Sequence, residues 1–343
     1  MKAAATDGKG KVWVADVPAP EPSEYQCLCK TLACATCTGT DIKHIHNKLP
    51  WKQEYPGLLG HESVGTVVEL GSKVKAFKKG DMVLRPAAVY PGERLGEYTS
   101  MWGGFAEYGL ITDSAAMKAD NPDAEVNNYV RFQQVVPLEL GISLADATML
   151  ITLKETASYV ASAGVTIGKS AAILGSGSVA LNMCRSAKVL GADPVIVIGR
   201  REEPLERARR IGADITVNTN EADPVQAIKD ATGGKGVDLL IDATGDPDFV
   251  RTCMAALAPE GKAGPYATYP ADDPVRKSIA PDKLAPARTG EDLAHPYMLD
   301  AVRLGLVDLS DFYSHRLSLA QIAEGFEMLA RKEAFKIVFE MES

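Results

Sequence analysis

The chain has 343 residues, a formal net charge of −8 and a hydrophobic fraction of 46%. This length exceeds what one hydrophobic core usually supports, so two domains are expected. The acidic balance and the lack of a long apolar run argue against binding to nucleic acid or to a membrane. The first residues, MKAAATDGKG, lack the apolar core of a signal peptide, and six cysteines are too few for a disulfide scaffold. A reducing, cytoplasmic location is therefore expected.

The first half of the chain is predicted to be rich in strands and turns. Short strands are expected at 11–17, 63–70 and 81–86, because β-branched and apolar residues there are bounded by glycine and proline. A helix is expected at 143–163, where the pattern of short strands and turns ends. The pattern predicts a β-rich domain that ends near residue 150.

The second half alternates apolar strands with amphipathic helices. Strands are expected at 170–175, 194–199 and 237–245, and helices at 181–192 and 203–213. Apolar strands that alternate with helices are typical of a parallel sheet covered on both faces. The sequence therefore predicts a doubly wound α/β domain, followed by a segment that mixes helix with a terminal strand.

A glycine-rich turn, G-x-G-x-x-A, follows the first of these strands and opens a helix. It contains Gly175, Gly177, Ser178 and Val179, and we also count Thr244, after the strand at 237–245, among the candidate cofactor contacts. The glycines allow close approach of the backbone, so that the helix N-terminus can face a pyrophosphate. The alternative is a strand–helix turn without a ligand. The motif lies between the strand at 170–175 and the helix at 181–192, and the second strand ends at Gly199 as such a unit requires. This context favours dinucleotide binding.

The end of the second strand bears on the choice between NAD and NADP. An NAD site usually places an acidic residue near Gly199, whereas here Arg200 and Arg201 follow the glycine. Two guanidinium groups can hold a 2′-phosphate. The alternative is a solvated start of a helix, in which Glu202 and Glu203 neutralise the arginines. The missing acidic residue favours NADP, with NAD as the second possibility.

A second motif lies in the β-rich half, where residues 60–74 have the spacing G-H-E-x2-G-x5-G-x2-V. With ACATC at 33–37, GGFAEY at 103–108 and AGVTIG at 163–168, the chain resembles the zinc-containing medium-chain alcohol and polyol dehydrogenases along its whole length. The resemblance implies a GroES-like catalytic domain and a Rossmann domain. The implied domains cover residues 1–150 (GroES-like), 151–290 (Rossmann) and 291–343 (C-terminal return to the catalytic domain).

The resemblance implies one catalytic zinc. Cys37 and His61 match the first two ligands, and Glu62 matches the carboxylate that polyol-type members use beside the histidine. A thiolate, an imidazole and a carboxylate suit Zn²⁺, and a catalytic site keeps one position open. Asp41 matches the aspartate that fixes the tautomer of the ligating imidazole. A lone histidine is more often structural, but the surrounding signature favours a ligand.

The segment after the cysteine departs from the family pattern. The family usually reads C-G-T-D, whereas this chain has one additional residue between Cys37 and Asp41, so an alternative alignment puts Thr38 at the ligand position. We favour Cys37, because threonine is a poor zinc ligand. Thr40 is then expected to relay the alcohol proton toward Lys43 or His44. These three residues are the candidate proton path.

A second departure concerns the position where many relatives carry a further ligand. Here that position is Ile151, and Glu155 lies one helical turn later, where it is a possible replacement ligand. The alternative for Glu155 is a capping box with Thr152 at the start of a helix.

The structural zinc that is common in the family is expected to be absent, since no cysteine lies between Cys37 and Cys184. A four-cysteine site with Cys27, Cys29 and Cys34 is a weaker alternative. Cys27 and Cys29 share one face of an expected strand, so they are predicted to pack in the core.

Taken with the resemblance, these motifs predict a zinc-dependent oxidoreductase that transfers a hydride between NADP and a secondary alcohol, polyol-like or sugar-like. The first rival is a zinc-free, NADPH-dependent reductase of activated double bonds on the same fold. The second is a nucleotide-binding protein without catalysis. A small-molecule alcohol or carbonyl substrate is expected as the ligand, and a homodimer or homotetramer as the assembly.

Overall fold

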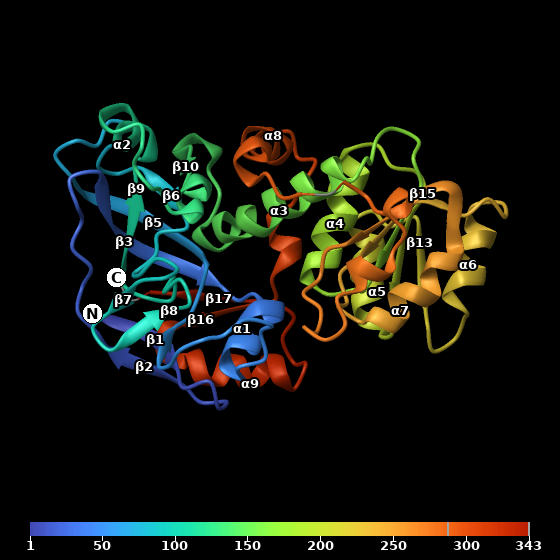
Figure 1. The fold of residues 1–343 in the computed structure, drawn as a ribbon, viewed down its shortest axis with the longest axis horizontal. Helices are drawn as coiled ribbons and strands as arrows, with labels where there is room; N and C mark the ends of the chain where they lie inside the picture. Colours follow the sequence, from blue (N-terminus) through green and yellow to red (C-terminus); the bar gives the residue numbers. More distant parts are fainter. Residues whose placement is uncertain (287, 342–343) are drawn as a thin grey trace. The chain divides into compact units, whose positions relative to one another are not determined.

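The computed structural model describes residues 1–286 and 288–341 (Figure 1). The chain forms two compact units, which we describe separately. The first contains Met1–Ile151 and Tyr313–Ser343, and the second contains Thr152–Phe312. No helix in the described part of the chain is both long enough and apolar enough to cross a membrane.

The first unit is built mainly of strands. Its strands are β1 (Lys2–Thr6), β2 (Val12–Asp16), β3 (Gln26–Ala35), β4 (Gly57–Leu58), β5 (Glu62–Leu70), β6 (Met82–Leu84), β7 (Arg94–Leu95), β8 (Tyr98–Ser100), β9 (Tyr108–Thr112), β10 (Val135–Val136), β16 (His315–Ser318) and β17 (Ile337–Glu340), and its helices are α1 (Thr38–Ile45), α2 (Ser114–Asp120) and α9 (Ile322–Ala330). One sheet has the order β2-β1-β4-β8-β7, and the other has the order β10-β6-β5-β3-β17-β16, with β9 also paired to β3. The predicted strands at 11–17, 63–70 and 81–86 are confirmed as β2, β5 and β6.

Strand β3 is the centre of the larger sheet. Its side chains alternate between half-buried and buried over most of its length, as a pleated strand requires. Cys27 and Cys29 point to one face and pack in a core cluster with Val67 and Ile111. Their predicted role as core residues is confirmed, and it leaves them unsuited to a four-cysteine metal site.

The C-terminal segment completes this sheet. Strand β17 pairs antiparallel with β3, with Phe339 opposite Cys34, and parallel with β16. Phe339 contacts Phe105 and Phe326, with ring centroids 5.6 and 6.2 Å away. Burying large aromatic side chains contributes about 1.5–3 kcal/mol each. The last residues therefore stabilise the same core as the first hundred.

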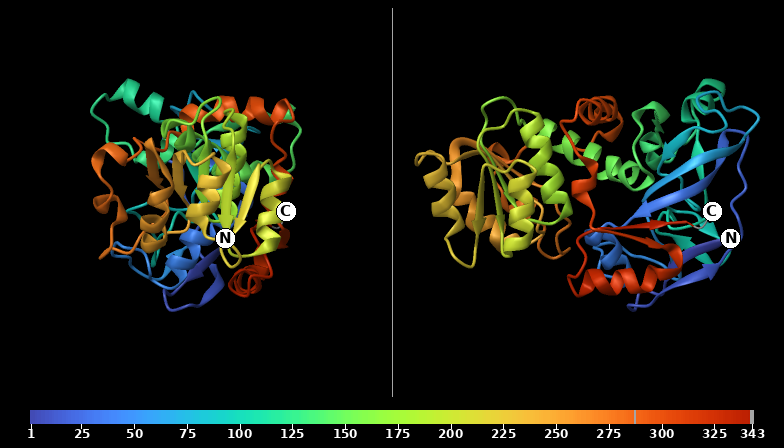
Figure 2. Two further views of the ribbon diagram at one scale, coloured as in Figure 1. Left: turned by 90° about the vertical axis from the view of Figure 1, so that its right-hand side faces the viewer. Right: turned by 180° about the vertical axis from the view of Figure 1, so that it is seen from behind.

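The second unit is a parallel sheet with helices around it (Figure 2). Its strands are β11 (Ala171–Leu174), β12 (Val195–Gly199), β13 (Ile215–Asn218), β14 (Val237–Asp242) and β15 (Leu257–Pro265), and its helices are α4 (Ser178–Val189), α5 (Glu202–Arg210), α6 (Pro224–Ala231), α7 (Pro247–Cys253) and α8 (Glu291–Arg303). The strand order is β13-β12-β11-β14-β15, and every residue of β11 and β12 is buried. The predicted doubly wound sheet is confirmed.

Helix α3 (Leu144–Ser162) contains the boundary between the two units. It begins well before Thr152, so Thr152 and Glu155 lie inside the helix. The proposed capping box at these two residues is therefore wrong, because only the first turn of a helix has backbone N–H groups to cap.

The second boundary lies at 312/313 rather than at the expected 290/291. Helix α8 and the residues after it belong to the second unit. The buried Glu291 carboxylate of α8 faces the buried Lys154 ammonium of α3 at 3.8 Å, and the Arg185 guanidinium donates to the Leu306 carbonyl. These charged contacts hold α8 to its own unit, and composition alone did not indicate them.

We predict that Gly60, which precedes the histidine of the G-H-E motif, tolerates no side chain. Its φ is +101°, and an added Cβ would lie 2.6 Å from the backbone nitrogen of Phe105. Gly80 is a matched control, since its φ is +89° and its Cβ would meet no atom within 4 Å. Both Gly→Ala variants carry the left-handed strain, but Gly60→Ala adds about 1–3 kcal/mol from overpacking.

Calorimetry checks this prediction. Gly60→Ala should unfold at a lower Tm than Gly80→Ala, by roughly 2–4 °C for each kcal/mol. Equal Tm values would show that the backbone around Phe105 yields and that the crowding is not a constraint.

Candidate active site

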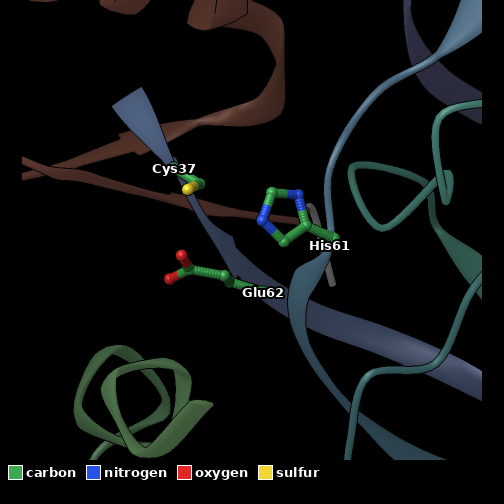
Figure 3. A group of neighbouring side chains, drawn as sticks. All are labelled: Cys37, His61 and Glu62. Carbon is green, nitrogen blue, oxygen red and sulfur yellow. The ribbon is translucent and has the colours of Figure 1, made fainter. Parts of the chain in front are cut away.

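The register of the larger sheet brings a cysteine to the G-H-E motif. Ala35, the last residue of β3, pairs with Glu62, the first residue of β5. Cys37 follows two residues later as the N-cap of α1, and His61 directly precedes β5. As a result, one sulfur, one nitrogen and one carboxylate oxygen from Cys37, His61 and Glu62 all lie within 4.8 Å of one another (Figure 3).

This donor set fits a zinc ion. Thiolate, imidazole and carboxylate are the ligand types of zinc sites, and three protein ligands leave the open position that catalysis needs. Bonds to zinc are about 2.0–2.3 Å long, so the three donors need to close only slightly around an ion. Glu62 is 3% exposed and the His61 side chain 12%. The site is thus held within the first unit.

Asp41 lies next to the Nδ1 side of the His61 ring. Its Oδ2 accepts a hydrogen bond from the Cys37 backbone nitrogen at 2.8 Å, and its Oδ1 lies 3.6 Å from His61 Nδ1. These last two atoms are buried and make no hydrogen bond with any described residue. Because Nδ1 faces Asp41, the other ring nitrogen points toward Cys37 and Glu62 (Figure 3). A carboxylate in this place orients a ligating imidazole.

The electrostatics of the site call for a cation. Burial, together with the nearby Glu62 and Asp41 carboxylates, raises the pKa of the Cys37 thiol to about 12. Burial also raises the pKa of Asp41, to about 6. A bound dication reverses this effect, because it stabilises the deprotonated forms of its ligands. The buried acidic groups thus match the chemistry of the donor set.

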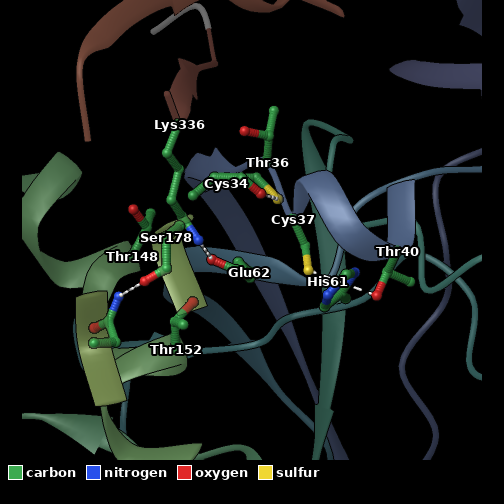
Figure 4. A network of polar contacts seen from close by, with 12 residues as sticks. Cys34, Thr36, Cys37, Thr40, His61, Glu62, Thr148, Thr152, Ser178 and Lys336 are labelled. Carbon is green, nitrogen blue, oxygen red and sulfur yellow. Dashed lines mark hydrogen bonds and ion pairs between the residues drawn. The ribbon is translucent and has the colours of Figure 1, made fainter. Parts of the chain in front are cut away.

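Lys336 is an ion-pair partner of Glu62 that the sequence did not reveal. It directly precedes β17, is 2% exposed, and makes a buried ion pair with Glu62 (Figure 4). Buried charges are costly unless they are paired, so each of these two groups depends on the other. The pair joins positions 274 residues apart, and no spacing rule in the sequence connects them.

The candidate proton path lies on α1. The Cys37 thiol contacts Thr40 Oγ1 at 3.6 Å (Figure 4). Lys43 occupies the last turn, and desolvation lowers its pKa. His44 is buried, its Nδ1 is hydrogen-bonded to Gln53 Oε1 at 2.7 Å, and desolvation lowers its pKa to about 4. The imidazole is therefore neutral near pH 7.

Two further residues shape the surroundings of His61. The Trp102 ring packs against His61 with centroids 4.9 Å apart and against His44 at 5.4 Å. Arg85 donates a hydrogen bond to the His61 carbonyl at 3.0 Å. Trp102 and Arg85 both have positive φ, at 69° and 62°, which is uncommon outside glycine. Such backbone strain is often found at functional sites, but it is visible only in the structure.

In the second unit, a cavity of about 290 Å³ lies at the carboxyl ends of the parallel strands. Its lining residues are Gly175, Ser176, Ile198, Gly199, Arg200, Arg201, Thr219, Thr244, Asp246 and Phe249. Five predicted cofactor residues thus come together. Gly177 is instead the N-cap of α4, and Ser178 and Val179 begin that helix, with the Ser178 hydroxyl buried and unbonded to any described residue. Doubly wound sheets bind ligands at this edge.

The neighbouring side chains crowd the glycine that ends β12. A Cβ on Gly199 would lie 2.5 Å from Ser176 Oγ and 2.9 Å from Ser176 Cβ, so any larger residue here would displace the Ser176 side chain. Arg200 is largely exposed, and its guanidinium lies 3.8 Å from the Asp246 carboxylate. Sequence reasoning missed Asp246, which is also the N-cap of α7.

Glu155 is engaged elsewhere. The Tyr266 hydroxyl donates to its carboxylate at 2.5 Å, and both residues belong to the second unit. Glu155 is not a member of the three-residue donor group, and Ile151 is fully buried.

Comparison with known proteins agrees with this geometry. Residues 178–285 match the family described as zinc-binding dehydrogenase, and residues 23–121 match the alcohol dehydrogenase GroES-like domain. The chain is 33% identical to an L-threonine 3-dehydrogenase of Pyrococcus horikoshii, with 74% of this chain and 71% of the relative covered. It is 32% identical to an NADP-dependent isopropanol dehydrogenase of Thermoanaerobacter brockii, with 76% and 74% covered.

The fold is also that of a solved structure. The alcohol dehydrogenase TADH from Thermus sp. ATN1 matches with a TM-score of 0.78 and 24% identity, and the match covers 100% of both chains. The two matched domains correspond to the strand-rich unit and the parallel-sheet unit. The chain therefore belongs to the zinc-binding, medium-chain alcohol dehydrogenase family and is an oxidoreductase of the alcohol dehydrogenase type.

Proposed function

We propose that the chain is a zinc-dependent dehydrogenase that transfers a hydride between a polar secondary alcohol, polyol-like or sugar-like, and NADP. The observation that carries the proposal is the convergence of Cys37, His61 and Glu62 within 4.8 Å. A zinc-free reductase of activated double bonds would have no use for this buried donor set. A nucleotide-binding protein without catalysis would have none either.

Each residue of the site has a distinct task. Cys37, His61 and Glu62 would hold the zinc, which when bound supplies a Lewis acid that polarises the substrate oxygen. Asp41 keeps the His61 ring in its ligating orientation. Thr40, beside the Cys37 sulfur, accepts the proton that leaves the alcohol and passes it toward Lys43 or His44. Near neutral pH, the His44 imidazole is unprotonated, and its lowered pKa means that it would pass the proton on rather than hold it.

The preference for a secondary alcohol is supported by two relatives. One is named for isopropanol and the other for position 3 of threonine, and both of these hydroxyls lie on secondary carbons. The carboxylate beside His61 supports a polyol-like member of this class. The substrate is thus proposed to carry polar groups beyond the reacting hydroxyl.

The preference for NADP is supported by the second unit. Gly199 offers no acidic side chain to bind the ribose 2′-hydroxyl, while Arg200 and Arg201 line the same cavity. A relative at 32% identity is named as NADP-dependent. An exposed guanidinium that is only loosely paired with Asp246 remains available to a phosphate.

We predict that the protein binds about one zinc per chain and that Glu62 is needed to hold it. Glu62→Gln keeps an oxygen that accepts from Lys336 but removes the anionic ligand, so zinc content should fall severalfold together with kcat. Glu155→Ala is the control, because it removes a half-buried carboxylate that is bonded to Tyr266 and lies outside the donor group. It should keep its zinc and lose about 1.5–3 kcal/mol of stability.

Elemental analysis of both purified variants and the wild type makes the comparison. Loss of metal from Glu155→Ala with retention in Glu62→Gln would reverse the ligand assignment. Two equivalents of zinc in the wild type would point to a second metal site.

We also predict that Arg200→Ala weakens the binding of NADP and leaves the binding of NAD nearly unchanged. A charge-assisted hydrogen bond contributes about 1.5–3 kcal/mol, so the KM for NADP should rise about ten- to hundredfold. Arg209→Ala is the control, because Arg209 pairs with Glu202 on the same helix and lies outside the cavity lining. Steady-state kinetics with both cofactors gives the answer, and a wild type that prefers NAD would already contradict the proposal.

A further inference from the structure

A buried lysine lies against one member of the metal donor set. Lys336 and Glu62 are 2% and 3% exposed, and their side chains form an ion pair, which Figure 4 shows close to Cys37 and His61. The donor atoms of Cys37, His61 and Glu62 lie within 4.8 Å of one another. The Glu62 carboxylate therefore belongs both to an ion pair and to the donor set.

The backbone around Lys336 fixes its position relative to the cysteine ligand. The Lys336 carbonyl accepts hydrogen bonds from the Ser314 backbone nitrogen at 2.9 Å and from the Ser314 hydroxyl at 3.2 Å. The next residue, Ile337, donates from its nitrogen to Thr36 Oγ1 at 3.1 Å, and its carbonyl accepts from the Thr36 nitrogen at 2.9 Å. Because Thr36 directly precedes Cys37, the same contacts place both the lysine backbone and the cysteine.

The ion pair and a metal ion use the same negative charge. A buried ammonium and a buried carboxylate depend on each other, because an unpaired charge in the protein interior is costly. A zinc dication bound by Glu62 would be weakened by Lys336 in two ways. The ammonium neutralises part of the carboxylate charge, and it also repels the dication directly. Without a metal, the ammonium has the opposite effect, since it compensates the buried carboxylate.

A positioning role for the lysine would have a different consequence. If Lys336 served only to orient Glu62 as a ligand, loss of the ammonium would weaken the binding of zinc. The structure favours competition, because other contacts already restrict Glu62. It is the first residue of β5, it pairs with Ala35 of β3, and its side chain is buried.

We propose that Lys336 is an internal competitor of the zinc ion. Its ammonium supplies positive charge to Glu62 before the metal binds, and it lowers the affinity of the site for zinc. The metal is then held less tightly than Cys37, His61 and Glu62 alone would hold it. This inference rests on the proposed zinc site and goes beyond it, since the affinity becomes a balance between the metal and a side chain of the same chain.

The test measures the zinc affinity of the full-length protein rather than its activity. Lys336→Met removes the charge and keeps an unbranched side chain, whereas Lys336→Arg keeps the charge. Equilibrium competition with a chelator that reports zinc by its colour gives the dissociation constant of each protein. We expect Lys336→Met to bind zinc roughly tenfold more tightly than the wild type, because the repulsion is lost. Lys336→Arg should bind zinc as the wild type does.

Thermal unfolding gives an independent measurement. The lysine compensates Glu62 most when no metal does so, and Lys336→Met should therefore lower the Tm of the metal-free protein more than that of the zinc-loaded protein. The rise in Tm on addition of zinc should accordingly be larger in Lys336→Met than in the wild type. Lys336→Gln, whose amide still offers Glu62 a hydrogen bond, replaces Lys336→Met if that variant does not fold, with the same expected directions.

The results that overturn this inference differ from those that overturn the zinc site. Unchanged or weaker zinc binding by the uncharged variants would assign Lys336 a positioning role instead of competition. Equal tightening in Lys336→Arg and Lys336→Met would show that the charge is not the cause. An equal loss of Tm with and without zinc would also overturn the inference. A wild type that binds no zinc would overturn the proposed site, and this inference with it.

Discussion

Strand β3 pairs with β5 on one side and with β17 on the other, and the position of the candidate metal ligands depends on this double pairing. Ala35 lies opposite Glu62 in one ladder and opposite Val338 in the other. The end of β3 therefore sets Cys37, Glu62 and Lys336 at the same edge of the sheet. A shift by one residue in either ladder would turn the side chains of that strand to the opposite face. Register thus decides whether the donor set exists.

The same edge of the sheet buries several acidic groups close to one another. A thiol and two carboxylates are buried together, and burial raises the pKa values of Cys37 and Asp41. Lys336 supplies a buried positive charge to Glu62, and Asp41 faces the imidazole of His61. Such a cluster is stable when its charges are paired and costly when one partner is removed. A metal dication fits this arrangement because it adds the charge that the acidic groups require.

Two of the buried polar atoms without a hydrogen-bond partner in the described part of the chain lie directly beside the donor set. His61 Nδ1 and Asp41 Oδ1 lie 3.6 Å apart, close to hydrogen-bond distance, and a small rotation would join them. His44 Nε2 and Gln53 Nε2 are also buried and have no hydrogen-bond partner among the described residues. Most buried polar groups in proteins are satisfied internally. The exceptions among the described residues include His61 and Asp41 beside the donor set, and also Ser178 and Asn182 in helix α4 of the second unit.

The two architectures, and the motifs on which the proposed chemistry rests, could be read from the amino-acid sequence. Local spacing was enough for the G-H-E motif, for the glycine turn after β11 and for Gly199 with its two arginines, because those residues act through neighbours in the chain. The tertiary structure decided the rest. It paired Lys336 with Glu62, placed Trp102 and Arg85 around His61, assigned α8 to the second unit and joined Glu155 to Tyr266 by a hydrogen bond. Each of these contacts joins residues far apart in the chain, so its geometry arises only when the strands and helices pack.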